Sequence, residues 1–127
     1  MAREVLIVDD DDAFRDLAAR VLTSWGHVVV GHAGTVAEAL ALVPELRPEV
    51  VLVDIGLPDG NGFSLTEKLV ALPWPMRVVL ISSDSDPANL SAAHRAGAFR
   101  FVPKDELPSD QLRDCMDWGE ACADSSK

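Results

Sequence analysis

The chain alternates short apolar runs with segments in which apolar residues recur at helical spacing. Four runs are rich in Val, Ile and Leu and span three or four residues, which is typical of strands covered on both faces of a sheet. A fifth run near the C-terminal end contains two phenylalanines. We expect five strands, at residues 5–8, 28–30, 50–53, 78–81 and 99–102.

Each of these runs is followed by a predicted helix. Between Phe14 and Trp25 the apolar residues recur along one helical face, and a glycine then ends the pattern. Thr35 and Glu38 have capping-box spacing and open a short second helix, which we expect Pro44 to end. The remaining helices are expected from Phe63 to about Leu72, from Asp86–Pro87 to Gly97, and from Leu107 to about Ala121.

This strict alternation with short connections predicts one architecture. Consecutive strand–helix units joined by right-handed crossovers give a five-stranded parallel sheet with helices on both faces. The expected fold is therefore α/β, a doubly wound (βα)5 three-layer sandwich. With 127 residues the chain has the length of one domain. We expect residues 1–127 to form it, with a core at about 3–121 and a flexible acidic tail at 122–127.

Composition narrows the class of protein. Apolar residues make up 48% of the chain and charged residues 25%, which is typical of a globular domain. The 21 acidic and 11 basic residues give a net charge of −10, which disfavours binding to nucleic-acid phosphates or anionic lipid. No apolar run approaches the roughly 20 residues of a membrane span. The first strand also begins too early to leave room for a signal peptide.

The spacing of the two cysteines indicates the redox state of their thiols. Cys115 and Cys122 are seven residues apart on one predicted helix, which separates them by roughly 10 Å along its axis, too far for a disulfide. We therefore expect reduced thiols and a cytoplasmic location.

The acidic residues gather in two places. The segment from Asp105 onward carries acids at helical spacing and is interpreted as a solvated helix face. The second cluster is the run Asp9 to Asp12, directly after a buried strand, where four carboxylates repel one another. One of them is expected to cap the following helix, with Asp11 and Asp12 serving as cap and surface. Asp9 and Asp10 are left for another role.

The ends of the predicted strands carry the residues suited to chemistry. In an open α/β sheet, ligands bind beyond the carboxyl ends of the strands. Asp9 and Asp10 follow the first strand, and Asp54 follows the third. Ser82 ends the fourth, and Lys104 follows the fifth. Three clustered carboxylates favour a hard divalent cation, Mg²⁺ or Mn²⁺, and the lysine and hydroxyl could bind a phosphoryl group.

These residues resemble the receiver domains of two-component response regulators. The resemblance covers essentially the whole chain and rests on four motifs found in order. They are Val8-Asp9-Asp10, Asp54-Ile55-Gly56-Leu57-Pro58, Ser82, and Phe101-Val102-Pro103-Lys104. Each motif alone is weak, whereas the four together are specific. The resemblance implies a flavodoxin-like, CheY-like fold and a cytoplasmic signalling protein.

The resemblance also implies a role for each acidic residue of the site. Asp54 would be the phosphoacceptor, receiving a phosphoryl group from a sensor histidine kinase or a histidine phosphotransfer protein. Asp10 would be the main Mg²⁺ ligand, Asp9 would hold a water on the metal, and Asp54 would be a further ligand. Gly56 would supply its backbone carbonyl. The chain would not be an enzyme, beyond catalysing its own phosphorylation and dephosphorylation.

The same resemblance implies a switch. Lys104 would bind the phosphoryl oxygens, Ser82 would close on the aspartyl-phosphate, and Phe101 would rotate inward with it. The signal would reach a downstream effector protein or a missing output domain. The implied partner and dimer surface comprises the fourth helix, fifth strand and fifth helix, near Leu90, Phe101 and Leu112. No nucleic acid or membrane would be bound directly by this chain.

Several alternatives stay open. The chain could be a stand-alone regulator or a receiver from a longer DNA-binding transcriptional regulator. A pseudo-receiver that binds partners without phosphorylation would be expected to lose an acid or the lysine. A phosphatase of the haloacid-dehalogenase type normally needs a second acid two residues after the nucleophile, where this chain has Gly56. A flavodoxin-type cofactor site would require a phosphate loop in place of Asp9 to Asp12.

Overall fold

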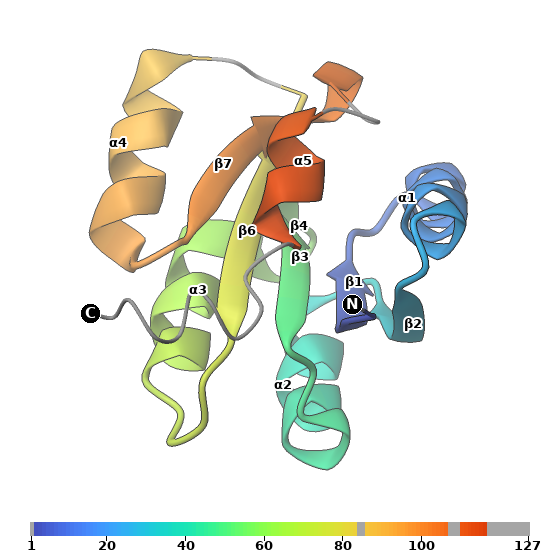
Figure 1. The fold of residues 1–127 in the computed structure, drawn as a ribbon. Helices are drawn as coiled ribbons and strands as arrows, with labels where there is room; N and C mark the ends of the chain where they lie inside the picture. Colours follow the sequence, from blue (N-terminus) through green and yellow to red (C-terminus); the bar gives the residue numbers. More distant parts are fainter. Residues whose placement is uncertain (1, 84–85, 107–109, 117–127) are drawn as a thin grey trace, which may run out of the picture.

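The computed structural model describes residues 2–83, 86–106 and 110–116. Its main sheet has five parallel strands in the order β2-β1-β3-β6-β7, which confirms the predicted parallel architecture (Figure 1). The order reverses direction between β1 and β3, the position where such folds open a crevice. The strands are β1 (Glu4–Val8), β2 (Val28–Ala33), β3 (Val50–Asp54), β6 (Arg77–Ser82) and β7 (Arg100–Pro103).

Helices cover both faces of this sheet. The faces alternate along each strand: Val5 and Ile7 pack on the side of α1 and α5, whereas Leu6 and Val8 pack on the side of α2, α3 and α4 (Figure 1). Each face thus has its own apolar core, as a doubly wound fold requires. The helices are α1 (Asp12–Ser24), α2 (Val36–Leu46), α3 (Gly62–Val70), α4 (Pro87–Ala96) and α5 (Asp110–Cys115), with a 3-10 turn η1 (Lys104–Glu106).

The predicted starts of α1 and α4 are confirmed by their caps. Asp11 is the N-cap of α1 and accepts hydrogen bonds from the amides of Ala13 and Phe14, at 3.0 and 3.4 Å. Asp86 caps α4 by accepting from the Ala88 amide. Gly97 ends that helix with φ of 96°, a left-handed conformation that favours glycine.

The capping box of α2 is built differently from the predicted one. Thr35 Oγ1 accepts from the Glu38 amide at 3.0 Å, as expected. The Glu38 carboxylate accepts instead from Gly34, one residue before the cap. A second carboxylate, that of Asp59, accepts from the amides of Val36 and Ala37 at 2.7 and 3.1 Å. The start of α2 is therefore held partly by a loop distant in sequence.

The structure differs from the sequence prediction at the end of α2 and in the loop after Asp54. Pro44 does not end α2, which continues to Leu46, because a proline in the last turn removes only one backbone hydrogen bond. The loop after Asp54 contains a short antiparallel pair, β4 (Gly56–Leu57) with β5 (Gly60–Asn61), which was not expected. The last helix is described only over Asp110–Cys115. Its predicted start at Leu107, its end near Ala121, and the tail at 122–127 lie outside the described residues.

Within the described part of the chain, no helix is both long and apolar enough to cross a bilayer.

Gly62 fixes the path of the chain next to Asp54. Its amide donates to the Ile55 carbonyl at 3.0 Å. A Cβ atom at this position would lie 2.6 Å from the Asp54 carbonyl oxygen, 2.9 Å from Ile55 Cα and 3.0 Å from Leu80 Cδ2. The first turn of α3 therefore packs directly on the backbone of β3, at a distance that only glycine permits.

We expect Gly62→Ala to lower the free energy of unfolding by about 1 to 3 kcal/mol, because backbone atoms must move to admit the methyl group. Helix propensity alone predicts the opposite sign, since alanine favours helices over glycine. Chemical denaturation measures the change. Gly56→Ala is the matched control, because a Cβ there meets only Asp54 Oδ2, at 4.0 Å. Equal stability of the two variants would contradict this account of Gly62.

Candidate functional site

The carboxyl ends of the central strands bring the predicted residues together. Asp54 is the last residue of β3 and pairs in register with Ile81, so Ser82 lies one step beyond it on β6. Ser82 in turn pairs with Pro103 of β7, which places Lys104 next to this edge. Asp9 follows β1 directly, and its amide donates to the Ala33 carbonyl at 2.9 Å. The parallel register therefore assembles the site from four strands.

A single ammonium group lies between two carboxylates in this site. Lys104 Nζ is 2.7 Å from Asp9 Oδ2 and 3.5 Å from Asp54 Oδ1. The Asp9 side chain is fully buried, and the side chains of Asp54 and Lys104 are 11% and 19% exposed. The ammonium also lies 4.6 Å from the centre of the Phe14 ring, whose face attracts cations. Contacts on several sides thus fix the lysine close to both acids.

The acids fit a divalent cation. Asp9, Asp10 and Asp54 can each offer one carboxylate oxygen, and these oxygens lie within 4.8 Å of one another. Asp9 Oδ2 is buried without a partner of hydrogen-bonding geometry among the described residues, although the ammonium lies close to it. Asp10 is exposed and leaves the cluster open to solvent. Oxygen donors of this kind suit Mg²⁺ or Mn²⁺, which retain several water ligands in protein sites.

The charges in the site shift the acidity of its groups. Burial raises the pKa of Asp54 to about 6; Asp9 and Asp10 raise it too, while Lys104 opposes the shift. Burial by itself would lower the pKa of Lys104. Its contact with Asp9 and the charge of Asp54 outweigh that effect and raise the pKa. At neutral pH the site therefore holds excess negative charge, which a cation would offset.

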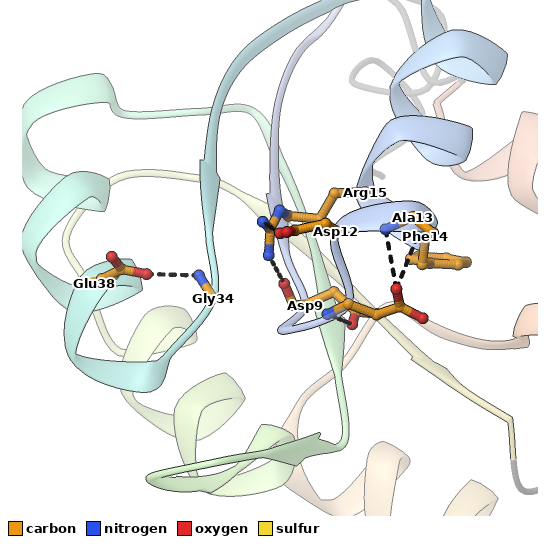
Figure 2. Close-up of polar contacts among 8 residues, drawn as sticks. Asp9, Asp12, Ala13, Phe14, Arg15, Gly34 and Glu38 are labelled. Atoms are coloured by element: carbon orange, nitrogen blue, oxygen red, sulfur yellow. Dashed lines mark hydrogen bonds and ion pairs between the residues drawn. The ribbon is translucent and has the colours of Figure 1, made fainter.

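The loop between β1 and α1 is held by its own hydrogen bonds (Figure 2). Asp9 Oδ1 accepts from the Asp11 amide at 2.8 Å. Arg15 Nη1 donates to the Asp9 carbonyl oxygen, and its Nη2 pairs with the Asp12 carboxylate. Arg15 was not among the residues predicted from the sequence. The one available signal was its position three residues after Asp12 on the same helix, a spacing that allows an ion pair.

The remaining predicted residues occupy different environments. Ser82 is 3% exposed at the end of β6. Gly56 adjoins the Asp54 carboxylate, as the 4.0 Å distance to its hypothetical Cβ indicates. Phe101 is half-buried and packs with the core on the α2–α3–α4 side.

The expected partner surface needs one correction. A groove between α4 and β7 is lined in part by Leu90 and Phe101, and Leu90 is 58% exposed. Leu112 is fully buried instead, in the core on the α1–α5 side of the sheet. The helical face that carries Leu112 packs inward, so this residue is not part of an accessible surface.

Comparisons with known proteins agree with this geometry. The family model described as the response regulator receiver domain matches residues 5–116. The chain is 39% identical over 118 residues to the DNA-binding transcriptional activator DevR/DosR of Mycobacterium tuberculosis, covering 91% of this chain and 54% of the activator. It is 31% identical to the chemotaxis protein CheY of Thermotoga maritima, covering 86% of this chain and 91% of CheY.

A solved structure gives the same result for the fold. The signal receiver domain of the putative response regulator NarL from Mycobacterium tuberculosis superposes with a TM-score of 0.83 and 32% sequence identity. The match covers 91% of this chain and 96% of that domain. The chain spans only about half the length of DevR/DosR, so it corresponds to one part of that regulator.

We expect Asp54→Asn to stabilise the metal-free protein at pH 8 by about 1 to 3 kcal/mol. The pKa of Asp54 is raised from 3.8 to about 6, so the folded state binds a proton more tightly than the unfolded state. Stability is therefore lost as pH rises from about 4 to about 6, and a neutral side chain escapes this loss. Chemical denaturation at pH 5 and pH 8 should give a smaller difference at pH 5.

Asp59→Asn is the matched control and should have the opposite sign. Backbone hydrogen bonds from Val36 and Ala37 lower the pKa of the Asp59 carboxyl, so its charge supports folding at neutral pH and this support is lost as pH falls. Added Mg²⁺ should reduce the advantage of Asp54→Asn by stabilising the parent protein. A less stable Asp54→Asn variant at pH 8 would contradict the raised pKa.

Proposed function

The chain belongs to the family of response regulator receiver domains, and we propose that it accepts a phosphoryl group on Asp54. The observation that carries this proposal is the buried contact of Lys104 with Asp9 and Asp54, beside the exposed carboxylate of Asp10. Receiver domains of response regulators act with histidine kinases and output domains. The proposed donor is accordingly a phosphohistidine on a sensor kinase or a histidine phosphotransfer protein.

Asp54 acts as the nucleophile in this proposal. One carboxylate oxygen attacks phosphorus, a P–O bond forms, and the P–N bond to the donor histidine breaks as the imidazole takes up a proton. Transfer of this kind depends on positioning and on neutralising charge more than on covalent chemistry by the protein. Asp54 lies at the end of a fully buried strand, and this strand holds its carboxylate in position for such an attack.

Neighbouring residues supply the remaining roles. Lys104 would bind the oxygens of the transferred group, and the Ser82 hydroxyl would close on the aspartyl-phosphate. Asp9, Asp10, Asp54 and the backbone carbonyl of Gly56 would hold Mg²⁺ or Mn²⁺. When bound, that cation would offset the repulsion between the attacking carboxylate and the anionic phosphoryl group. Movement of Ser82 would be followed by rotation of Phe101, which would alter the surface near Leu90.

The proposal extends to the role of the whole chain. We propose that residues 1–127 form one receiver domain that signals in the cytoplasm without turnover of external substrates. The alignment with half of a DNA-binding activator favours a receiver that governs a DNA-binding output domain. Similarity to CheY over most of its length favours signalling by direct protein contact. A pseudo-receiver is disfavoured, because Asp9, Asp10, Asp54 and Lys104 are all present.

Incubation with a small phosphodonor and Mg²⁺ should add the mass of one phosphoryl group to the intact protein. Asp54→Asn should abolish the gain, whereas Asp59→Asn should retain it, because Asp59 lies in the same loop but binds the start of α2. Intact-mass spectrometry measures both. An unmodified parent protein with every donor tested would favour the pseudo-receiver.

Lys104→Met should slow phosphorylation at saturating Mg²⁺ by roughly 100-fold, because one charged group that stabilises the transferred phosphoryl is lost. Mg²⁺ affinity should be unchanged or higher, since the removed ammonium competes with the cation for Asp9 and Asp54. Lys68→Met, at an exposed position on α3, is the control for loss of one positive charge. Phosphorylation of Lys104→Met at the parent rate would contradict the role of Lys104 in phosphoryl transfer.

A further inference from the structure

Arg15 is a largely enclosed basic group next to the acidic run. Its side chain is 19% exposed, although it lies in the second turn of α1 and pairs with an aspartate that is 86% exposed. Figure 2 shows the guanidinium directed back toward the loop, between the Asp9 carbonyl and the Asp12 carboxylate. A planar guanidinium can donate to two such partners at once.

The guanidinium also borders a second loop. A Cβ built on Gly34 would lie 3.5 Å from Arg15 Nη1, 3.5 Å from Glu38 Oε1 and 3.9 Å from Asp10 Cα. Gly34 belongs to the turn between β2 and α2, and its amide donates to Glu38 at 2.7 Å. Arg15 is therefore enclosed between the loop that follows β1 and the loop that follows β2, at the carboxyl end of the sheet.

These contacts give each of the four consecutive aspartates a different role. Asp9 Oδ1 accepts from the Asp11 amide, Asp11 caps α1, and Asp12 pairs with Arg15. One carboxylate oxygen of Asp9 and one of Asp10 lie within 4.8 Å of an Asp54 carboxylate oxygen. Without Arg15, the Asp12 carboxylate would lose its ion pair, and the Asp9 carbonyl would lose its side-chain donor.

We propose that Arg15 is a positioning residue for the cation site, an inference that rests on the function proposed above. By holding the Asp9 carbonyl and the Asp12 carboxylate together, it fixes the loop that carries Asp9 and Asp10. Residues that orient metal ligands in this way are commonly worth at least tenfold in metal affinity.

The charge of Arg15 makes the proposal sharply testable. A positive group near a cation site repels the cation, so electrostatics alone predicts that Mg²⁺ binds more tightly when Arg15 is replaced. Positioning predicts weaker binding. The two explanations therefore differ in sign.

The test is isothermal titration of Mg²⁺ into the metal-free protein and into Arg15→Gln. We expect the Mg²⁺ dissociation constant of Arg15→Gln to rise by about 10-fold. Arg20→Gln is the matched control, because it removes the same charge from an exposed position on the same helix. Its dissociation constant should stay within about twofold of the parent value, since exposed charges are screened. Phosphorylation of Arg15→Gln by a small phosphodonor should return close to the parent rate at saturating Mg²⁺.

Arg15→Lys distinguishes the effect of side-chain geometry on Mg²⁺ binding from the effect of charge. It also replaces Arg15→Gln as the test variant if Arg15→Gln does not fold. A lysine keeps the charge but lacks the planar fork, so Mg²⁺ binding should remain weakened by several-fold. Full recovery with lysine, or equal or tighter binding by Arg15→Gln, would overturn the positioning role and leave the proposed function intact. A parent protein that binds no Mg²⁺ would overturn both, so the two failures are distinguishable.

Discussion

Two carboxylates and one ammonium share a largely buried space at the edge of the sheet, and this imbalance of charge governs the rest of the site. Asp9 and Asp54 both contact Lys104, and the Asp10 carboxylate lies close enough to complete a cluster of three acids. Burial makes excess charge costly, so the site favours uptake of a positive species. A proton on Asp54 is one solution, which explains why its pKa is raised to about 6. A divalent cation is the other.

The fold keeps these like charges together by holding the backbone on both sides of them. Beyond Asp54, the Ile55 amide donates a hydrogen bond to the Ile81 carbonyl, and the Gly62 amide donates one to the Ile55 carbonyl. In the loop between Ile55 and Gly62, the Asp59 carboxylate accepts hydrogen bonds from the first two amides of α2. The chain after Asp54 is therefore tied to β6, to α3 and to α2. Repulsion between the acids cannot be relieved by a small shift of this loop.

The features that could be predicted from the sequence are those that depend on local pattern and on strand direction. The five strands and the convergence of Asp9, Asp54 and Lys104 follow from the alternation of elements, because parallel strands place their carboxyl ends at one edge. The residues that were missed act through backbone atoms of a nearby loop or strand end. The spacing of Arg15 from Asp12 allowed an ion pair, but it did not indicate the contact with the Asp9 carbonyl, and no pattern along the chain indicated how closely Gly62 approaches the Asp54 carbonyl.

Net charge illustrates why location matters more than composition in this protein. The total of −10 disfavours anionic partners but does not distinguish one aspartate from another. Among the four consecutive acids, Asp11 is used by a helix and Asp12 by Arg15, and Asp9 and Asp10 are left to the cluster. A phosphoryl group on Asp54 would replace one negative charge with nearly two. The single ammonium of Lys104 could not then neutralise both Asp9 and the new group, so its contacts would have to be redistributed. In the proposed function, that redistribution would accompany the movement of Ser82 and the rotation of Phe101 through which the site would report its state.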